Sequence, residues 1–372
     1  MKPIQIVIFS AVFLVFLAAN YYVFYRIWRM MPPTAAGKTV LIACAAVLVC
    51  SFFLAMFLRN AGMPVWFISG LYRVGTAWVF IFLYLLMVFL VADLLRVTHV
   101  LPAKIMYSNW LSLGVLAGAM AVVFGTGNIV YHNKKRVELV IETGKHMERP
   151  VKIVAASDLH LGYGVSRREL SRWVDMINRE KPDIILFAGD IIDSSPYPLW
   201  KGGYADELRR LEARYGVWMA PGNHEYISGV GESLHFLEEA GINVLRDSVA
   251  LIDGAFYVVG RDDRENSRRQ SIAGLTAGTD PALPVVLLDH QPYHLEEAEA
   301  AGVDLQLSGH THYGQVWPVT WITRSMYEQA YGYLEKGDTK YWISSGLGIW
   351  GGKFRIGSRS EYVVAKIFST ME

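Results

Sequence analysis

The sequence predicts an α/β domain that follows four membrane-spanning helices. Residues 1–131 carry only nine charged side chains, eight of them basic, whereas the rest of the chain has an ordinary density of charge. From residue 151 onward, short apolar segments of strand type alternate with polar clusters and an amphipathic helix, which is the pattern of α/β domains. The composition of residues 1–131 is therefore typical of a membrane-embedded segment, and that of the rest of the chain is typical of a domain in water.

Four charge-free stretches predict the membrane helices, because about 20 apolar residues are needed to cross a bilayer. We place the helices at about residues 3–25, 39–58, 74–95 and 107–131 and assign residues 1–133 to a transmembrane domain. Tyrosine and tryptophan gather near the helix ends, where they suit the lipid–water interface. Four such stretches in succession argue against buried helices of a soluble core.

Small and ionisable residues within the membrane segment indicate helix packing rather than a transport pathway. Gly114 and Gly118 form a GxxxG pattern that we expect to pack inside the bundle. Asp93 is the ionisable residue inside a span, and Arg96 three residues later can pair with it. A transporter is therefore not expected.

The predicted orientation of the helices in the membrane rests on a small difference in the number of basic residues on its two sides. With four helices, six basic residues lie on the side of the termini and five on the other side. The run Lys134, Lys135 and Arg136 directly after the last helix favours a cytoplasmic C-terminal domain.

The elements after the membrane segment alternate as an α/β domain requires. Residues 134–149 form a connector with a strand candidate at 137–142, and the next domain covers residues 150–372. A strand at 151–157 precedes Ser166 and Glu169, which we expect to form a capping box that opens a helix. Further strands are expected at 184–188, 216–220, 284–288 and 303–307.

Polar clusters follow these strands, at the place where open α/β sheets bind ligands. The candidate metal ligands in these clusters are Asp158, His160, Asp190, Asn223, His290, His310 and His312. Their oxygen and nitrogen atoms suit Mn, Fe, Zn, Co or Ni, with no thiolate among them. Seven candidates exceed what one tetrahedral zinc needs, so we expect two metals that share a carboxylate. Glycines at 189, 222 and 309 are expected to let the backbone turn sharply.

These residues resemble the motif blocks of the calcineurin-like metallophosphoesterase superfamily. The blocks are Asp158-Leu159-His160, Gly189-Asp190, Gly222-Asn223-His224-Glu225, His290 and Gly309-His310-Thr311-His312. The resemblance covers roughly residues 150–368, and its C-terminal part is similar to a bacterial membrane-associated branch of phosphodiesterases. Tyr313 departs from the glycine that commonly follows the last block in that branch.

The resemblance implies a β-sandwich flanked by helices in four αββα layers. It assigns Asp158, His160, Asp190 and His312 to one metal, and Asp190, Asn223, His290 and His310 to the other. The catalytic residues it implies are His224, Asn223 and Asp190. Two cations that share a water lower its pKa for attack on phosphorus, and His224 stabilises charge or protonates the leaving oxygen. The expected metals are divalent or trivalent, with manganese preferred.

Several further residues receive weaker interpretations. His294 is expected to begin a helix at 293–301 rather than to bind metal. For Asp193 two interpretations carry equal weight, one that it orients a metal ligand and one that it has no such role. Arg261, Arg264, Arg268 and Arg269 lie among acidic residues, which favours a solvated surface over a phosphate-binding site. Aromatic loops at 197–200 and 317–321 are expected either to face a lipid surface or to pack against the sheet.

The expected function is phosphoester hydrolysis at a bacterial inner (plasma) membrane, with the catalytic domain in the cytoplasm. The expected substrate is a lipid or lipid-linked phosphodiester or pyrophosphate, and membrane lipids are the expected partners. A soluble nucleotide phosphodiester and an inactive membrane scaffold remain alternatives. A formal net charge of +1 gives no reason to expect nucleic-acid binding.

Overall fold

A computed structural model describes residues 3–59, 61–107 and 109–370. The chain divides into two compact units, residues 1–126 and 127–372, each of which is described by itself.

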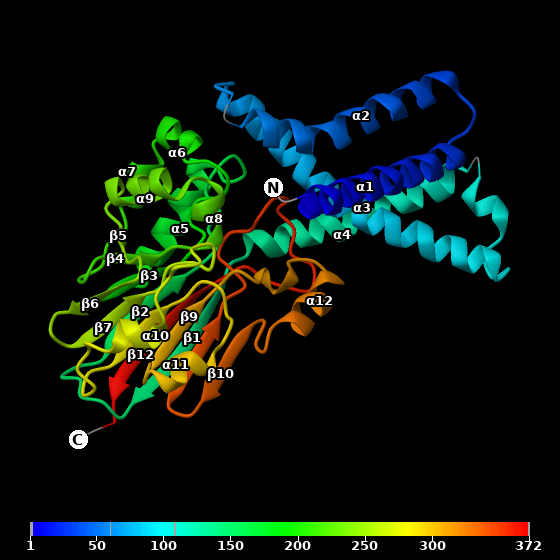
Figure 1. Cartoon of the computed structure of the whole chain (residues 1–372). Helices are drawn as coiled ribbons and strands as arrows, with labels where there is room; N and C mark the ends of the chain where they lie inside the picture. Colours follow the sequence, from blue (N-terminus) through cyan, green and yellow to red (C-terminus); the bar gives the residue numbers. More distant parts are fainter. Residues whose placement is uncertain (1–2, 60, 108, 371–372) are drawn as a thin grey trace. The chain divides into compact units, whose positions relative to one another are not determined.

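The first unit is helical (Figure 1). Its elements are α1 (Pro3–Met30), α2 (Ala35–Leu58), α3 (Val65–Val97), the 3-10 helix η1 (Ala103–Met106) and α4 (Trp110–His132), whose last turns belong to the second unit. Within the described residues, four helices are long and apolar enough to cross a membrane.

The expected pairing of Asp93 with Arg96 is present but is not the main one, and the expected packing of the GxxxG pattern is wrong. The Asp93 carboxylate pairs with Arg26 of α1 and accepts a hydrogen bond from Tyr22 Oη at 2.5 Å, while Arg96 Nε is 3.9 Å away. Its main partners thus come from another helix, because α1 and α3 pack together. A Cβ added at Gly114 or Gly118 would meet no described atom within 4 Å, so the GxxxG pattern does not pack inside this bundle.

The second unit contains two six-stranded mixed sheets (Figure 1). The first sheet has the order β1 (Lys135–Thr143), β12 (Glu361–Ser369), β2 (Val151–Ala156), β3 (Ile184–Ala188), β4 (Val217–Ala220) and β5 (Asn243–Val244). The second has the order β10 (Gly332–Lys336), β11 (Thr339–Ile343), β9 (Leu305–Ser308), β8 (Val285–Leu288), β7 (Phe256–Gly260) and β6 (Ser248–Ile252). Neighbours β2, β3 and β4 run parallel, as do β7, β8 and β9.

Strand alternation divides the buried side chains among three cores. Ile153 and Ile184 face Val286 of the second sheet in the central core. Residues one position along, such as Val154 and Ile185, face the outer helices of the first sheet. Those helices are α5 (Arg167–Arg179), α7 (Tyr204–Leu208) and α9 (Val230–Glu239).

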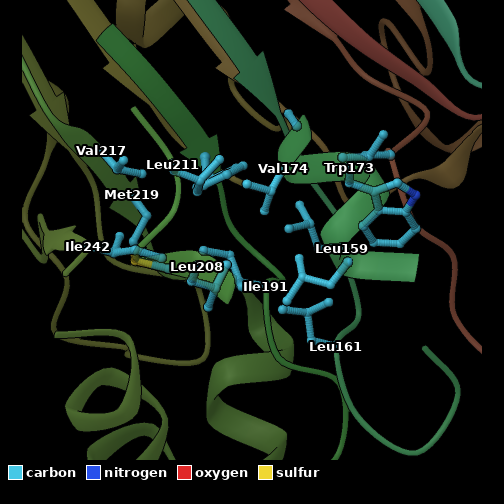
Figure 2. Packing of buried hydrophobic residues seen from close by; sticks show 14 of the residues in the cluster. Leu159, Leu161, Trp173, Val174, Ile191, Leu208, Leu211, Val217, Met219 and Ile242 are labelled. Carbon is cyan, nitrogen blue, oxygen red and sulfur yellow. The ribbon is translucent and has the colours of Figure 1, made fainter. Parts of the chain in front are cut away.

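Figure 2 shows Trp173 and Val174 of α5 beside Leu159 and Leu161 of the loop after β2, within the outer core of the first sheet. On the other face of the sandwich, α10 (Ile272–Thr276) and α11 (Glu296–Ala300) pack on the second sheet. The predicted β-sandwich flanked by helices is therefore confirmed.

The start of α5 differs from the expected capping box. Ser166 Oγ accepts a hydrogen bond from the backbone N–H of Glu169 at 3.3 Å, so the N-cap is as predicted. The Glu169 carboxylate, however, accepts a hydrogen bond from Tyr131 Oη at 2.6 Å and pairs with Lys353. The side chain links the end of α4 to the C-terminal loop instead of completing the box.

Candidate metal centre

All seven predicted ligands meet between the carboxyl ends of the two sheets. The first sheet supplies Asp158 after β2, Asp190 after β3 and Asn223 at the start of α8 (Asn223–Ile227), which follows β4. The second sheet supplies His290 after β8 and His310 after β9. His160 and His312 lie two residues beyond Asp158 and His310. Parallel strands bring these ends together because their carboxyl ends share one edge.

One group contains Asp158, His160 and His312, whose potential ligand atoms all lie within 4.8 Å of one another. The Nε2 atoms of His160 and His312 are 3.0 Å apart. Oδ1 of Asp158 lies 3.6 Å from His312 Nε2 and 3.9 Å from His160 Nε2.

A second group contains Asp190, His290 and His310, also within 4.8 Å. His290 Nε2 is 3.0 Å from Asp190 Oδ2, and His310 Nδ1 is 2.8 Å from Asn223 Oδ1. Asp190 Oδ2 lies 3.9 Å from His160 Nε2 as well, which places Asp190 between the two groups. A third overlapping group joins His224 to His160 and Asp190.

These residues fit metal ions. Two nitrogen ligands at 2.0–2.1 Å from one ion and at right angles lie about 3 Å apart, which is close to the separation of His160 and His312. His290 Nε2 is buried without a hydrogen-bond partner and faces Asp190. The donor set of carboxylate, amide and imidazole suits divalent transition metals.

Burial and neighbouring charges shift the pKa values of several groups in the cluster. Burial opposes ionisation of Asp190, yet positive charge on His290 and His224 holds the pKa of Asp190 well below its usual value. Burial raises the pKa of Asp158, and the charge of Asp190 adds to that effect. Burial and the charge of His290 lower the pKa of His310 to about 4, so this ring is neutral, the form that binds metals.

Asp193 contacts two histidines, which supports the idea that it orients a ligand. Its Oδ1 lies 3.4 Å from His160 Nδ1 and 3.2 Å from His224 Nδ1, and its backbone oxygen is 2.8 Å from His224 Nδ1. Burial lowers the pKa of His224, but the charges of Asp190 and Asp193 outweigh burial and raise it to about 10.

The backbone at the cluster is strained. Positive φ angles occur at Asp158 (55°), His160 (48°), Asp190 (55°), His310 (69°) and His312 (47°). Side chains rarely adopt this left-handed region, and such strain concentrates at functional sites. Five of the seven candidate ligands therefore have a strained backbone, whereas Asn223 and His290 have no positive φ.

The three glycines of the blocks act in two ways. Gly189 has φ of +77° and makes the expected sharp turn. Gly222 has φ of −110°, and a Cβ there would collide with the side chain of Asp190. A Cβ at Gly309 would collide with Asp158. The expectation of a sharp turn is wrong for Gly222, where glycine instead allows two segments to approach closely.

Two buried residues that sequence reasoning gave no role organise the centre. Glu225 is fully buried and accepts hydrogen bonds from the backbone N–H groups of Asp190, Ile192 and Gly222 at 2.8–3.0 Å. Arg355 is also buried and donates to the backbone oxygens of His312 and Ser345, among others. The available signal for Glu225 was its position inside the third block, directly after His224.

The arginine-rich loop is not an ordinary solvated surface, contrary to expectation. Arg261 is buried and pairs with Asp289 at 3.1 Å, and Arg269 pairs with the same carboxylate at 3.2 Å. Buried Asp289 needs this positive charge, which draws both arginines inward. Arg264 and Arg268 are exposed.

Other predicted features lie at the margins of the centre. His294 is exposed 3.4 Å from Glu296 and outside the metal-ligand groups, as expected, although the helix there covers only Glu296–Ala300. Tyr313 packs against Tyr331, with ring centroids 4.9 Å apart. In the aromatic loops, Trp200 and Trp317 are each about two-fifths exposed.

A model of the calcineurin-like phosphoesterase family matches residues 151–314. A protein of Aquifex aeolicus described as an uncharacterized metallophosphoesterase is 34% identical over 257 residues, which cover 67% of this chain and 97% of the relative. The chain belongs to the calcineurin-like metallophosphoesterase family. The predicted family is therefore confirmed.

Two further members of the family, both longer than the Aquifex aeolicus protein, are also similar. A Campylobacter jejuni metallophosphoesterase is 30% identical over 227 residues, or 60% of each chain. A Danio rerio protein named transmembrane protein with metallophosphoesterase domain is 32% identical over 267 residues, 67% of this chain and 60% of the relative. The chain thus spans about 60% of the length of these two relatives. Four apolar helices and a relative named as a transmembrane protein indicate a membrane protein.

Proposed function

We propose that this metallophosphoesterase is a membrane-anchored phosphoester hydrolase that acts on a lipid or lipid-linked phosphodiester or pyrophosphate. The observation that carries the proposal is the position of Asp190, which belongs to the group with His290 and His310 and also lies 3.9 Å from His160 Nε2 of the other group. In this proposal residues 1–133 anchor the chain, residues 134–149 connect, and residues 150–372 form the catalytic domain. The catalytic domain faces the cytoplasm at a bacterial inner membrane.

The proposed ligands follow the two groups. Asp158, His160, Asp190 and His312 hold one ion, and Asp190, Asn223, His290 and His310 hold the other, with manganese as the preferred metal. When bound, two such ions lower the pKa of a water and stabilise negative charge on phosphoryl oxygens. The position of Asp190 supports this assignment, because its Oδ2 lies 3.0 Å from His290 Nε2 and 3.9 Å from His160 Nε2.

His224 is the proposed proton donor. Its Nδ1 must donate to the backbone oxygen of Asp193 at 2.8 Å, so Nε2 is the nitrogen that remains for the leaving oxygen of the substrate. The carboxylates of Asp190 and Asp193 raise the pKa of His224 to about 10 against the effect of burial, which keeps the ring protonated. Metal ions in the centre would lower that pKa toward the range of an effective acid.

The helix α12 (Val319–Met326) supports the lipid substrate. Its buried side chains are Thr320 and Thr323, whereas Trp321, Ile322 and Met326 are 63%, 58% and 61% exposed. Arg324 and Ser325 are exposed as well, so three large apolar side chains share the exposed face, whereas an ordinary helix on a water-soluble domain buries such side chains. Exposed tryptophan and aliphatic residues suit insertion into a lipid interface.

The test is hydrolysis by full-length protein in detergent with added manganese. We expect turnover of bis-(p-nitrophenyl) phosphate and release of phosphorylated headgroups from a bacterial lipid extract, both abolished in Asp190→Ala. Turnover of soluble nucleotide diesters without any lipid product would contradict the lipid assignment. Metal binding without turnover of any phosphoester would indicate a scaffold and overturn the enzymatic proposal.

A further inference from the structure

The loop that contains Arg261, Arg264, Arg268 and Arg269 is held by contacts to the segment that carries His290. Asp289, next to that histidine, pairs with Arg261 and Arg269. From the other direction, Gln291 Nε2 donates hydrogen bonds to both carboxylate oxygens of Asp263 at 2.9 Å. Because residues on both sides of His290 hold the loop, the position of the loop is fixed relative to the metal centre.

Arg264 differs from the other arginines that this loop places near Asp289. It is exposed, and its guanidinium carbon lies 4.0 Å from the ring centroid of Tyr293. Among residues 3–59, 61–107 and 109–370, no carboxylate lies within ion-pair distance of this guanidinium. Arg268 of the same loop is also exposed and outside ion-pair distance of the described carboxylates, so the stacking on Tyr293 is what distinguishes Arg264.

Aromatic rings connect Arg264 to the metal centre. Tyr293 and Tyr327 lie with ring centroids 4.9 Å apart and hydroxyl oxygens 3.1 Å apart. The ring of Tyr327 is in turn 6.3 Å from the ring of His310, a candidate ligand. Both tyrosines are partly exposed. The side chains of His310, Tyr327, Tyr293 and Arg264 thus form a continuous row of neighbours.

We propose that Arg264, supported on Tyr293, binds a second phosphate group of the substrate while the scissile phosphoester occupies the metal centre. This inference rests on the proposed function and names a substrate class for it. A guanidinium stacked on an aromatic ring keeps its in-plane N–H groups available for two parallel hydrogen bonds to a phosphate. Tyr327 and Tyr293, which lie between His310 and Arg264, set the separation between the two anionic groups.

The test uses full-length, manganese-loaded protein and alkane-α,ω-diol bisphosphates of two to eight carbons, with inorganic phosphate as the single-anion reference. Affinities are measured by calorimetry and by competition against bis-(p-nitrophenyl) phosphate. We expect one chain length to bind at least about tenfold more tightly than inorganic phosphate, because charge-assisted hydrogen bonds contribute at that level. In Arg264→Ala this preference should disappear, and in Arg264→Lys part of it should return.

Arg268→Ala is the matched control, since Arg268 is exposed on the same loop and is not assigned to the subsite. It should keep the full preference for the bisphosphate. Equal affinity for all bisphosphates and inorganic phosphate in the unmodified protein would overturn the inference, as would a preference that survives in Arg264→Ala. Absence of metal binding and of turnover would instead contradict the proposed function, and calorimetry would still measure the preference directly.

Discussion

The carboxylate of Glu225 accepts a hydrogen bond from the backbone N–H of Asp190 at 3.0 Å and thereby joins the loops after β3 and β4. Burial, together with the nearby charge of Asp190, raises the pKa of Glu225 to about 7. The buried side chain satisfies two further N–H groups, those of Ile192 and Gly222. Glu225 therefore holds the candidate ligand Asp190 in its strained conformation.

Glu225→Gln should destabilise the catalytic domain. The amide group would place N–H donors against backbone donors, which costs about 1–3 kcal/mol for each unsatisfied buried group. We expect a lower Tm in detergent, together with reduced manganese content measured by mass spectrometry. Glu212→Gln, at an exposed position outside the centre, is the control. An unchanged Tm would show that Glu225 does not hold the loops.

Asp190→Ala and His310→Ala should differ in the amount of metal they lose. Asp190 lies between both ligand groups, whereas His310 belongs to one of them. We therefore expect Asp190→Ala to retain far less manganese per protein than His310→Ala, which should keep about one ion. Equal metal loss in the two variants would contradict a shared ligand at position 190.

His224→Ala should lower turnover much more than metal content. The proposed proton donor is worth about 10²–10⁴ in rate, and its loss leaves the seven candidate ligands in place. The measurement is kcat on bis-(p-nitrophenyl) phosphate beside metal content on the same preparation. If metal content falls in parallel with kcat, His224 is a ligand, as the group of His160, Asp190 and His224 would allow.

Glu169→Gln should reduce stability in a pH-dependent way. Burial opposes ionisation of Glu169, but Lys353 and the hydrogen bond from Tyr131 outweigh it and hold its pKa below the ordinary value of 4.5. Because the folded-state pKa is the lower one, the stabilisation is complete above the unfolded pKa and is lost as pH falls through the folded pKa.

At pH 7 we expect Glu169→Gln to lower the free energy of unfolding by about 1–3 kcal/mol. The difference from the unmodified protein should shrink below about pH 4, as carboxylates become protonated. Thermal unfolding followed between pH 3 and 8 measures this. A difference that is constant over the whole range would exclude the ion pair with Lys353 as its source.

Replacing Trp321 and Ile322 of α12 by serine should reduce turnover of lipid substrates about tenfold or more, since two large apolar side chains no longer enter the interface. Turnover of bis-(p-nitrophenyl) phosphate should stay within about twofold. The control replaces Val249 and Leu251, exposed apolar residues of β6, by serine. Equal loss on both substrates would contradict a lipid-facing role for α12.

Local pattern in the sequence determined much of this protein. Apolar strands that end in Asp158, Asp190 and His310 were sufficient to predict an α/β domain and the group of residues that meets at the strand ends, because strand direction and side-chain alternation are local properties. The sandwich itself was implied by the resemblance of the motif blocks to a known family. Long charge-free stretches likewise specified the membrane helices.

Only the tertiary structure decided which distant groups became partners. Spacing favoured Arg96 as the partner of Asp93 and a solvated surface for Arg261, whereas packing gave Asp93 to Arg26 and drew Arg261 to buried Asp289. The three backbone groups that Glu225 satisfies lie on two loops that are separate in sequence. A buried charge takes whichever partner the fold brings within reach, and sequence separation does not encode that distance.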